Sequence, residues 1–485
     1  MILFKLFILG TLTALMFPPF FMLPLGFIIF PYFVKLIFKI DSNKSILTYF
    51  SYGYFYGLGF FLIFLSWIQN PFLVFKATQP FAILAILLPV FLSIFFGLSF
   101  IIYKFLKDLI FIILLTAFIF VFTEFLISNF LYGFPWFTYS LILSNNFFGF
   151  YLIKYFGTIT SGFLILSIFL FPLILTNLKQ FIKIKKLILF SYTPFLLILF
   201  LPLIHSYDSN NKLNKNITLD IHQIYSPINA ININAVKQNI FKSIESSDSN
   251  FIIFAENNYP EIISENNYIN IIDKIKKNKK VIIGATSVED DKIYNSFLFL
   301  EEDKVQHFDK KILVPFGEFL PFRNYLKFME KISGTIDFDI GNKDRIIISE
   351  EGIKIFPIIC YEIIFDKIFK DINKYEVDII INITNDSWFG NKIGPYQHFY
   401  LTRLKSLITN KPIVRVSNNG ISAIIDQKGK IIKSSKLNHV SNLKHKLTFN
   451  KSFSYYLIHN LFSIYLFILF IILLVFKKIH FNEKK

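Results

Sequence analysis

A single cysteine stands at the end of an apolar run, in Lys354-Ile-Phe-Pro-Ile-Ile-Cys360, and Glu362 follows two residues later. This pattern is typical of a buried strand that presents a thiol at its end. A thiolate can attack a carbonyl carbon if a nearby base or cation lowers the pKa of the thiol. A free cysteine is also among the most buried residue types and often packs as a small hydrophobic side chain. The groups around Cys360 must decide between a nucleophile and a core residue.

Two other segments supply the groups that acyl transfer to a thiol requires. The run Phe251-Ile-Ile-Phe-Ala-Glu256 ends in a carboxylate that suits a general base, unless it is only a solvated loop residue. Lys310 and Glu318 flank a Pro-Phe-Gly turn, a rigid loop that could direct an amine and a carboxylate towards one cleft. Lysines are common here and usually solvated, so Lys310 alone indicates little. Together the three segments indicate a site for covalent acyl transfer.

The elements that position these residues are expected to form an α/β domain. Segment 205–454 has ordinary polar alternation and is long enough for a sizeable core. Short β-branched runs predict buried strands, and helix-length segments alternate with them. The fold class is therefore an α/β sandwich, with strands at Phe251–Ala255, Val281–Ala285, Lys354–Ile359, Asp378–Ile383 and Ile413–Ser417, and helices at Ala230–Ser247 and Tyr396–Asn410.

The rest of the chain is far more apolar. Hydrophobic residues make up 54% of the 485 residues and charged residues 17%, against about a quarter in ordinary soluble domains. A membrane span takes about 20 apolar residues. About eight such windows predict a polytopic α-helical membrane domain, at 2–17, 20–38, 46–68, 79–103, 108–128, 147–176, 184–204 and 455–476. Four prolines interrupt the first two windows, which could instead form one hairpin that does not fully cross.

Lysines near the span ends predict the orientation, because such residues are retained on the cytoplasmic side. They lie near the start of the first span and near the ends of the even-numbered ones, at Lys5, Lys35, Lys39, Lys44, Lys104, Lys107, Lys179, Lys183, Lys185, Lys186, Lys477 and Lys478. The other loops carry little more than Lys76. We therefore expect a seven-span domain at 1–204, an extracytoplasmic catalytic domain at 205–454, a C-terminal span at 455–476 and a tail at 477–485. Both termini are then cytoplasmic.

Three further features restrict the class of protein. The net charge of +17 does not indicate nucleic-acid binding, because the lysines are scattered rather than clustered with aromatic residues. One cysteine excludes an intramolecular disulfide. Residues Met1 to Phe17 are followed by further apolar segments without a small-residue cleavage site, so we interpret them as a first span and not as a signal peptide.

A set of motifs in fixed order resembles the nitrilase superfamily, and most closely its membrane branch, the apolipoprotein N-acyltransferase family. The motifs are Glu256 after a strand, Lys310-Lys-Ile-Leu-Val-Pro-Phe-Gly-Glu318, Cys360-Tyr361-Glu362 and Asn385-Asp-Ser-Trp-Phe-Gly390. The stretches Tyr132-Gly-Phe-Pro-Trp136, Gly394-Pro-Tyr-Gln-His398 and Arg415-Val-Ser-Asn-Asn-Gly420 are also similar to that branch. The resemblance covers nearly the whole chain, and the ordered set is far more specific than any one motif.

The resemblance implies an αββα sandwich and a Glu-Lys-Cys triad. Glu256 would be the general base for Cys360, and Lys310 would stabilise the tetrahedral oxyanion. Six more residues would support them. Glu318 would orient Lys310, Tyr361 and Glu362 would position the nucleophile and the second substrate, Asn385 would contribute to the substrate site, and Trp388 and Phe389 would line an apolar mouth for acyl chains.

The implied reaction has two half-reactions. Cys360 takes an acyl chain from a phospholipid as a thioester, and the α-amino group of a diacylglyceryl-cysteine at an apolipoprotein N-terminus accepts it. This is the last step of bacterial lipoprotein maturation. We expect a monomer in the bacterial inner membrane with a periplasmic catalytic domain. No metal and no organic cofactor is expected.

The chain departs from the family pattern at several positions. Asn257 follows Glu256 where the family usually has threonine, Phe308 stands where a tyrosine is common, and Ile408 replaces a usual glutamate. The segment His222-Gln-Ile-Tyr-Ser-Pro227 matches only loosely. These departures would slow turnover, and a copy that folds without turning over is one alternative.

Two other functions are consistent with parts of the pattern. A membrane-anchored carbon-nitrogen hydrolase would use the same thioester with water as acceptor. A transporter with a structural Cys360 would keep ionisable residues near the bilayer midplane. Glu124 is almost the only acidic residue in the expected spans, and its place near a span end favours an interfacial carboxylate over a substrate contact.

Overall fold

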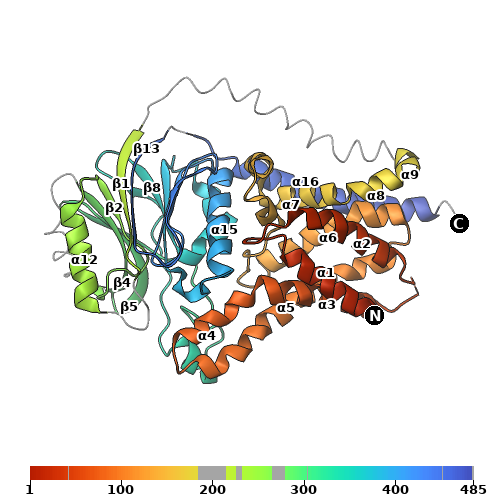
Figure 1. Ribbon diagram of the computed structural model, residues 1–485, viewed down its shortest axis with the longest axis horizontal. Coiled ribbons are helices and arrows are strands. Elements are labelled where there is room, and N and C mark those ends of the chain that lie inside the picture. The colour runs from red at the N-terminus through yellow and green to blue at the C-terminus, as the bar shows by residue number, and fades with distance from the viewer. Residues whose placement is uncertain are drawn as a thin grey trace. The chain divides into compact units, whose positions relative to one another are not determined.

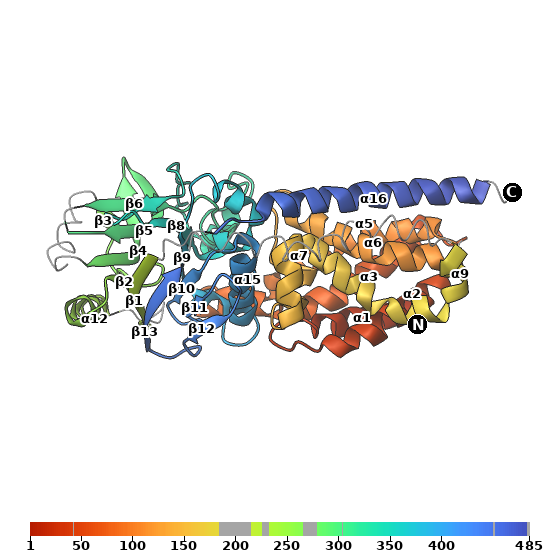
Figure 2. The same cartoon turned by 90° about the horizontal axis from the view of Figure 1, so that it is seen from above.

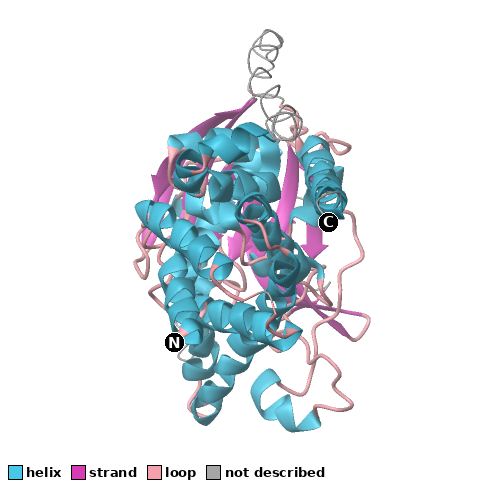
Figure 3. Cartoon of the chain, turned by 90° about the vertical axis from the view of Figure 1, so that its right-hand side faces the viewer, coloured by secondary structure: helices cyan, strands magenta, loops and turns pink. Residues whose placement is uncertain are grey.

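The computed structural model describes residues 1–41, 43–183, 215–225, 232–264, 279–302, 304–449 and 452–482. The chain forms two compact units. Unit 1 comprises the described residues of 1–66, 85–212 and 455–485, and unit 2 those of 67–84 and 213–454. Every strand in the described residues belongs to unit 2 (Figure 3, magenta).

Unit 1 is built from apolar helices. They are α1 (Ile2–Ala14), η1 (Leu23–Leu25), α2 (Gly26–Phe38), α3 (Ile46–Phe64), α5 (Leu87–Phe100), η4 (Ile101–Phe105), α6 (Leu109–Asn129), η5 (Tyr139–Leu143), α7 (Phe147–Phe169), α8 (Phe171–Thr176), α9 (Leu178–Lys183) and α16 (Tyr456–Asn482). Five helical stretches among the described residues are long and apolar enough to cross a membrane, at Ile46–Phe64, Gln79–Phe105, Leu109–Asn129, Phe147–Phe169 and Tyr456–Val475. They match five of the expected windows.

The other three expected windows have different outcomes. The first two contain separate helices, α1 and α2, which are apolar but shorter than 18 residues. The window 184–204 lies outside the described residues. The Glu124 side chain is buried inside unit 1, where Oε2 accepts a hydrogen bond from the Tyr139 N–H at 2.9 Å, and its expected place at the membrane interface stays a prediction.

Glycines let the helices of unit 1 approach backbone to backbone. A Cβ on Gly10 of α1 would lie 2.0 Å from the Tyr56 carbonyl oxygen of α3, and one on Gly53 would lie 2.2 Å from the Phe96 carbonyl oxygen of α5. Close packing of this kind is typical of helices that associate in lipid. Tyr56 also shares a 2.8 Å hydrogen bond with Thr13 of α1.

Unit 2 contains two sheets. The first has the order β13-β1-β2-β4-β5-β6, with β3 beside β4, and the second has the order β12-β11-β10-β9-β8-β7. The strands are β1 (Lys215–Gln223), β2 (Phe251–Ile253), β3 (Ile263–Ser264), β4 (Lys280–Glu289), β5 (Lys292–Leu300), β6 (Val305–Asp309), β7 (Ile347–Ile348), β8 (Lys354–Ile359), β9 (Ile379–Thr384), β10 (Ile413–Ser417), β11 (Ala423–Ile425), β12 (Ile431–Ser434) and β13 (Ser441–Phe449). The five expected strands are confirmed.

Two long helices cover the sheets, so that unit 2 has four layers (Figure 1). Helix α12 (Ile233–Ser246) covers the first sheet, because Val236, Ile240 and Ile244 lie on one face and pack into its core. Each such side chain stabilises the fold by roughly 1.5–3 kcal/mol on burial. Helix α15 (Gly394–Thr409) lies against β10 of the second sheet (Figure 2). The expected αββα sandwich and both expected helices are confirmed.

The parallel strands place the candidate residues at one edge of each sheet. β1, β2 and β4 run parallel, as do β8, β9 and β10. Glu256 follows β2, Cys360 follows β8 and Asn385 follows β9. Ligand sites of parallel sheets form outside the carboxyl ends of the strands. The other short helices of unit 2 are α4 (Asn70–Val74), η8 (Lys327–Met329), α14 (Glu330–Ser333), η9 (Cys360–Ile364), η10 (Asp366–Asp371) and η11 (Asp386–Phe389), while η2 (Ser66–Gln69) and η3 (Gln79–Ile86) each include residues of both units.

Candidate active site

The thiol of Cys360 lies at the junction of β8 and η9 and is only 5% exposed. The backbone of this residue is left-handed, with φ of 49°, a conformation that costs a non-glycine residue about 1–3 kcal/mol. Burial raises the pKa of the thiol and the charge of Glu256 raises it further, while Lys310 lowers it. The resting group is therefore a thiol, which needs a base before it can attack.

The carboxyl group of Glu256 lies beside this thiol. Its Oε1 accepts a hydrogen bond from Asn295 Nδ2 at 2.8 Å, and its Oε2 accepts one from the Asn385 N–H at 2.8 Å. A hydrogen bond also joins it to the Cys360 side chain. Burial raises the pKa of Glu256, an effect that Lys310 opposes. A carboxylate in this position can take the proton of the thiol.

Lys310 follows β6 and is 1% exposed. Its Nζ lies 2.7 Å from Glu318 Oε1 and 3.5 Å from Glu256 Oε1. Burial disfavours the charged amine, but the two carboxylates and Cys360 outweigh it and raise the pKa of Lys310 above its ordinary value. The other oxygen of Glu318 accepts a hydrogen bond from the Val314 N–H at 2.8 Å. This bond ties the loop that follows Lys310 to the Lys310–Glu318 ion pair. Lys310 is thus held as an ammonium.

These groups form one buried set with the components of acyl transfer. A thiol, a carboxylate that can accept its proton and a cation that can stabilise an oxyanion lie together. The structure places Glu256 against both Lys310 and Cys360, with Glu318 bonded to Lys310 and the Asn385 N–H bonded to Glu256.

Glu362 lies in a buried network of hydrogen bonds. The side chain is fully buried, and Arg345 donates to it from Nη1 at 2.7 Å and Nη2 at 2.6 Å. The backbone N–H groups of Lys311, Ile312 and Ile359 also donate to it. Its oxygens therefore tie the end of β8 to the loop that follows β6, and the role expected for Glu362 at the second substrate stays a prediction.

The other supporting residues lie around the set. Tyr361 is 7% exposed, and its ring packs edge-on against Phe365 with centroids 5.1 Å apart. The Asn385 side chain caps η11 by accepting from the Ser387 N–H at 3.2 Å. Trp388 is 36% exposed in the same turn.

A segment distant in sequence packs on this turn. The Trp67 ring meets the Phe389 ring edge-on with centroids 5.0 Å apart, and Trp67 Nε1 donates to Gln397 Oε1 at 3.0 Å. Asn70 Nδ2 donates to the Phe389 carbonyl oxygen at 3.1 Å. Trp67 falls at the end of the expected span 46–68 and Asn70 in the loop that follows it, and no site contact was expected for either.

The departures from the family pattern occupy ordinary positions in the fold. The Phe308 ring is buried with the Arg345 guanidinium 4.5 Å from its centroid, an arrangement that favours a cation. Ile408 is buried in α15. Asn257 has φ of 49°, which asparagine tolerates better than most residues. Slower turnover from these departures stays a prediction.

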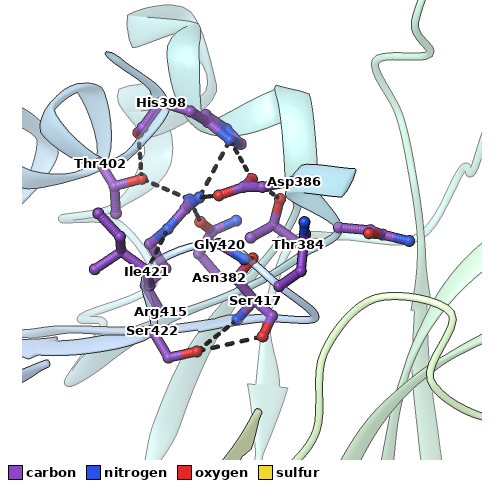
Figure 4. Close-up of polar contacts among 12 residues, drawn as sticks. Asn382, Thr384, Asp386, His398, Thr402, Arg415, Ser417, Gly420, Ile421 and Ser422 are labelled. Atoms are coloured by element: carbon purple, nitrogen blue, oxygen red, sulfur yellow. Dashed lines mark hydrogen bonds and ion pairs between the residues drawn. The ribbon is translucent and has the colours of Figure 1, made fainter. Parts of the chain in front are cut away.

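A second buried polar group joins Asp386, His398 and Arg415, and no role was expected for it (Figure 4). Arg415 Nη2 donates to Asp386 Oδ2 at 2.6 Å, and Asp386 Oδ1 lies 2.9 Å from His398 Nδ1. The three side chains are 0% exposed. His398 and Arg415 belong to the family-like stretches that begin at Gly394 and Arg415, so the sequence did contain a signal for them. Asn295 and Arg345 lie in no such stretch, so the sequence contained no signal for their contacts.

One group of side chains has the donors of a metal site. Glu289, His307 and Asp309 hold ligand atoms within 4.8 Å of one another among the described residues. The Lys343 amine also contacts the His307 ring and places a positive charge there. That charge disfavours a cation, and none of the three belongs to the set around Cys360.

The comparisons with known proteins cover both units. The family model described as apolipoprotein N-acyltransferase N-terminal domain matches residues 9–171, and the carbon-nitrogen hydrolase model matches residues 250–440. Apolipoprotein N-acyltransferase of Rickettsia prowazekii is 30% identical over 96% of this chain and 96% of its own length. The enzyme of the same name from Rickettsia typhi is 30% identical over 90% of each chain.

The structural comparison gives weaker likenesses. Saccharomyces cerevisiae Nit3, a member of branch 10 of the nitrilase superfamily, is 18% identical with a TM-score of 0.37, and the match covers 48% of this chain and 90% of that one. The sequence matches extend along nearly the whole chain and include both family models. The chain therefore belongs to the apolipoprotein N-acyltransferase family.

Proposed function

We propose that this chain moves an acyl chain from a phospholipid to the α-amino group of a diacylglyceryl-modified apolipoprotein, through a thioester on Cys360. Its family and its apolar helices make it a bacterial membrane acyltransferase that acts in lipoprotein maturation. The observation that carries the mechanism is that the buried Glu256 carboxyl group contacts both Lys310 and Cys360.

The first half-reaction charges the thiol. Glu256 takes the proton of Cys360, and the thiolate attacks the ester carbonyl of the phospholipid. The new oxyanion is stabilised by the Lys310 ammonium. When the intermediate collapses, the carbon-oxygen bond breaks and the lysophospholipid alkoxide takes the proton from Glu256, which leaves an acyl thioester.

The second half-reaction transfers the acyl chain from the Cys360 thioester to the amine. A neutral α-amine attacks the thioester carbonyl, again with Lys310 facing the oxyanion. Glu256 accepts the amine proton, the carbon-sulfur bond breaks, and the proton returns to Cys360. A thiolate is a good leaving group when an amine attacks a thioester, so a thioester suits this transfer.

The proposed setting follows from the lysine distribution. Residues 1–204 and 455–476 span the inner membrane, 205–454 lie in the periplasm, and both termini, including the tail 477–485, are cytoplasmic. Both substrates are lipid-anchored, which favours a catalytic domain tied to spans. We propose that the enzyme acts as a monomer, with Trp388 and Phe389 lining the entry for acyl chains.

The test uses the purified full-length chain in phospholipid vesicles that contain an alkyne-tagged phospholipid. Wild type is expected to carry a tagged adduct that neutral hydroxylamine removes, and Cys360→Ser to carry none that hydroxylamine removes. Absence of the adduct from wild type, or its unchanged appearance in Cys360→Ser, would overturn the thioester.

The acceptor separates the proposal from the hydrolase alternative. Addition of a diacylglyceryl-cysteine peptide is expected to discharge the adduct into an N-acyl peptide, detected by mass spectrometry. Release of free fatty acid with no N-acyl peptide would instead identify water as the acceptor.

A further inference from the structure

The two oxygens of the Glu256 carboxylate have different kinds of donor. Oε1 accepts a hydrogen bond from the Asn295 amide at 2.8 Å and lies 3.5 Å from Lys310 Nζ, and both of these are side-chain groups. Oε2 accepts a hydrogen bond from the backbone N–H of Asn385 at 2.8 Å. A backbone donor cannot change its direction through a side-chain rotamer, so its direction depends on how the turn after β9 is held.

The peptide group between Thr384 and Asn385 is bonded at both ends. Its N–H donates to Glu256, and its carbonyl oxygen, which belongs to Thr384, accepts a hydrogen bond from the Asn418 N–H at 3.1 Å. The side chains of the two residues that flank Asn385 are also joined, since Thr384 Oγ1 donates to Asp386 Oδ1 at 3.2 Å. The Asp386 side chain therefore helps to set the orientation of this peptide group.

Arg415 holds Asp386 in place (Figure 4). Its Nη2 donates to Asp386 Oδ2 at 2.6 Å, and both side chains are 0% exposed. Nη1 donates to Asn382 of β9 and to Thr402 of α15 at 3.0 Å each, and Nε donates to the Ile421 carbonyl oxygen at 3.2 Å. Burying an ion is costly unless its partners are well placed, and these partners meet that condition. The guanidinium group is therefore held in one orientation.

We infer that Asp386 and Arg415 are positioning residues whose ion pair holds the Asn385 N–H against Oε2 of Glu256. The inference rests on the proposed function, in which Glu256 is the base for Cys360. A base must be deprotonated, and a hydrogen bond to the carboxylate favours that form. The ion pair thus acts on the reaction through a backbone group of the turn.

Gly420 indicates how closely this ion pair is enclosed. A Cβ on Gly420 would lie 2.0 Å from Asp386 Oδ2 and 2.5 Å from Ser417 Oγ. Asp386 cannot turn away freely, because both of its carboxylate oxygens are already bonded to neighbouring side chains. A side chain at position 420 must therefore displace the Asp386 carboxylate from Arg415.

The principal variant of the test is Gly420→Ala, because it disturbs Asp386 and removes no charge. Asp386→Asn would instead leave the buried Arg415 cation without its charged partner, a loss that can abolish folding. Arg415→Lys is the second variant. It keeps the positive charge but replaces the planar fork of donors with a single ammonium group.

The measurement is the pH dependence of two rates of the purified full-length chain. One is the rate of alkylation of Cys360 by iodoacetamide, which needs no acyl donor and reports one site, because the chain has one cysteine. The other is the single-turnover rate of thioester formation from the tagged phospholipid. The charged and titratable groups that face Glu256 are Lys310, Glu318 and Cys360, and both variants keep all of them.

In Gly420→Ala we expect the acid limb of both pH–rate profiles to move to higher pH by about one pH unit, the scale on which one hydrogen bond stabilises a charged group. Loss of the N–H donor raises the pKa of Glu256, which then takes up a proton at a higher pH. Above the limb, the rate of thioester formation is expected to fall by about tenfold, because the carboxylate loses its alignment. Arg415→Lys should move the limb in the same direction.

Gly429→Ala is the matched control, in the turn between β11 and β12. Its φ of 75° strains an added side chain, and the three atoms nearest to the new Cβ all belong to Leu407, the first at 2.8 Å. The Tm is therefore expected to fall, while both pH–rate profiles stay as in wild type.

A wild-type acid limb in folded Gly420→Ala and Arg415→Lys, whatever their Tm, would overturn the inference, and so would an equal shift in Gly429→Ala. If one of the two variants does not fold, the other decides alone. If neither folds, the milder Thr402→Val, which removes one acceptor of Arg415, replaces them with the same expected direction. A shifted alkylation limb without any lipid adduct in wild type would contradict only the proposed function, whereas a normal adduct with an unmoved limb would contradict only this inference.

Discussion

The Glu256 carboxylate owes its reactivity to opposing neighbours. Burial raises its pKa, whereas Lys310 and the Asn295 amide lower it. Asn295 Nδ2 donates both to Glu256 Oε1 and to Glu318 Oε1, at 2.8 Å each. The Asn295 amide therefore fixes Glu256 and Glu318 relative to each other.

Asn295→Ala is expected to move the acid limb of the pH–rate profile for thioester formation to higher pH. Glu256 accepts the thiol proton only when it is deprotonated, and burial already raises its pKa above the ordinary value. Loss of a donor that stabilises the carboxylate raises the pKa of Glu256 further. As the pH is lowered, the variant therefore loses its activity at a higher pH than wild type does. The measurement is the single-turnover rate as a function of pH. Asn342→Ala, at an exposed position, should keep the wild-type profile, and an unmoved limb in Asn295→Ala would contradict the argument.

Glu362→Gln is expected to destabilise unit 2. It leaves the Arg345 guanidinium, which is 8% exposed, without its charged partner, and breaking a buried pair in this way costs about 3–5 kcal/mol. Glu376→Gln removes the charge from the exposed Lys354 pair and should cost about 0–1 kcal/mol. Thermal unfolding of the solubilised chain measures both. A normal Tm with a raised KM for the lipopeptide would support the role first expected for Glu362.

The elements of unit 2 place the site through a close approach between β4 and the turn after β2. A Cβ on Gly284 would lie 2.5 Å from the Glu256 Cα and 2.6 Å from the Asn257 nitrogen. These are backbone atoms, so a side chain at this position must displace the turn. Glycine in β4 therefore contributes to where the base lies.

Gly284→Ala is expected to lower the single-turnover rate by about tenfold or more, because the carboxylate is displaced from the thiol. Gly352→Ala is a suitable control, since its φ of 74° strains an added side chain but nothing lies within 4 Å of the new Cβ. That variant should lose roughly 1–3 kcal/mol of stability and keep its rate. Equal rates in the two variants would show that the approach to Glu256 is not limiting.

At the scale of the whole molecule, the helices of unit 1 and the lysines between them predict which side of the membrane each segment occupies. Ser45 lies in a loop between α2 and α3 that follows Lys39 and Lys44, and Asn342 lies in unit 2. The proposal places these two exposed residues on opposite sides.

Single-cysteine variants test this orientation, because Cys360→Ser leaves no other thiol. In that background Asn342→Cys should react with a membrane-impermeant maleimide on intact spheroplasts. Ser45→Cys should react only after the membrane is permeabilised. The reverse pattern would place the catalytic domain in the cytoplasm and contradict the positive-inside argument.

Local patterns in the sequence were sufficient for the sandwich and for the reactive groups. Glu256 and Cys360 each end an apolar run, and the carboxyl ends of parallel strands collect at one edge, so a strand pattern already indicates a shared site. Apolar length likewise indicated the five helices long enough to span a membrane among the described residues. These properties depend on neighbours along the chain.

Only the tertiary structure decided which polar groups meet. Arg345 lies against Glu362 and His398 lies against Asp386, and no local pattern indicated either contact. Trp67 joined unit 2 from a stretch assigned to a span end. A buried charge or amide requires a partner, but nothing local in the sequence specifies that partner, because the contact forms between segments that only folding brings together.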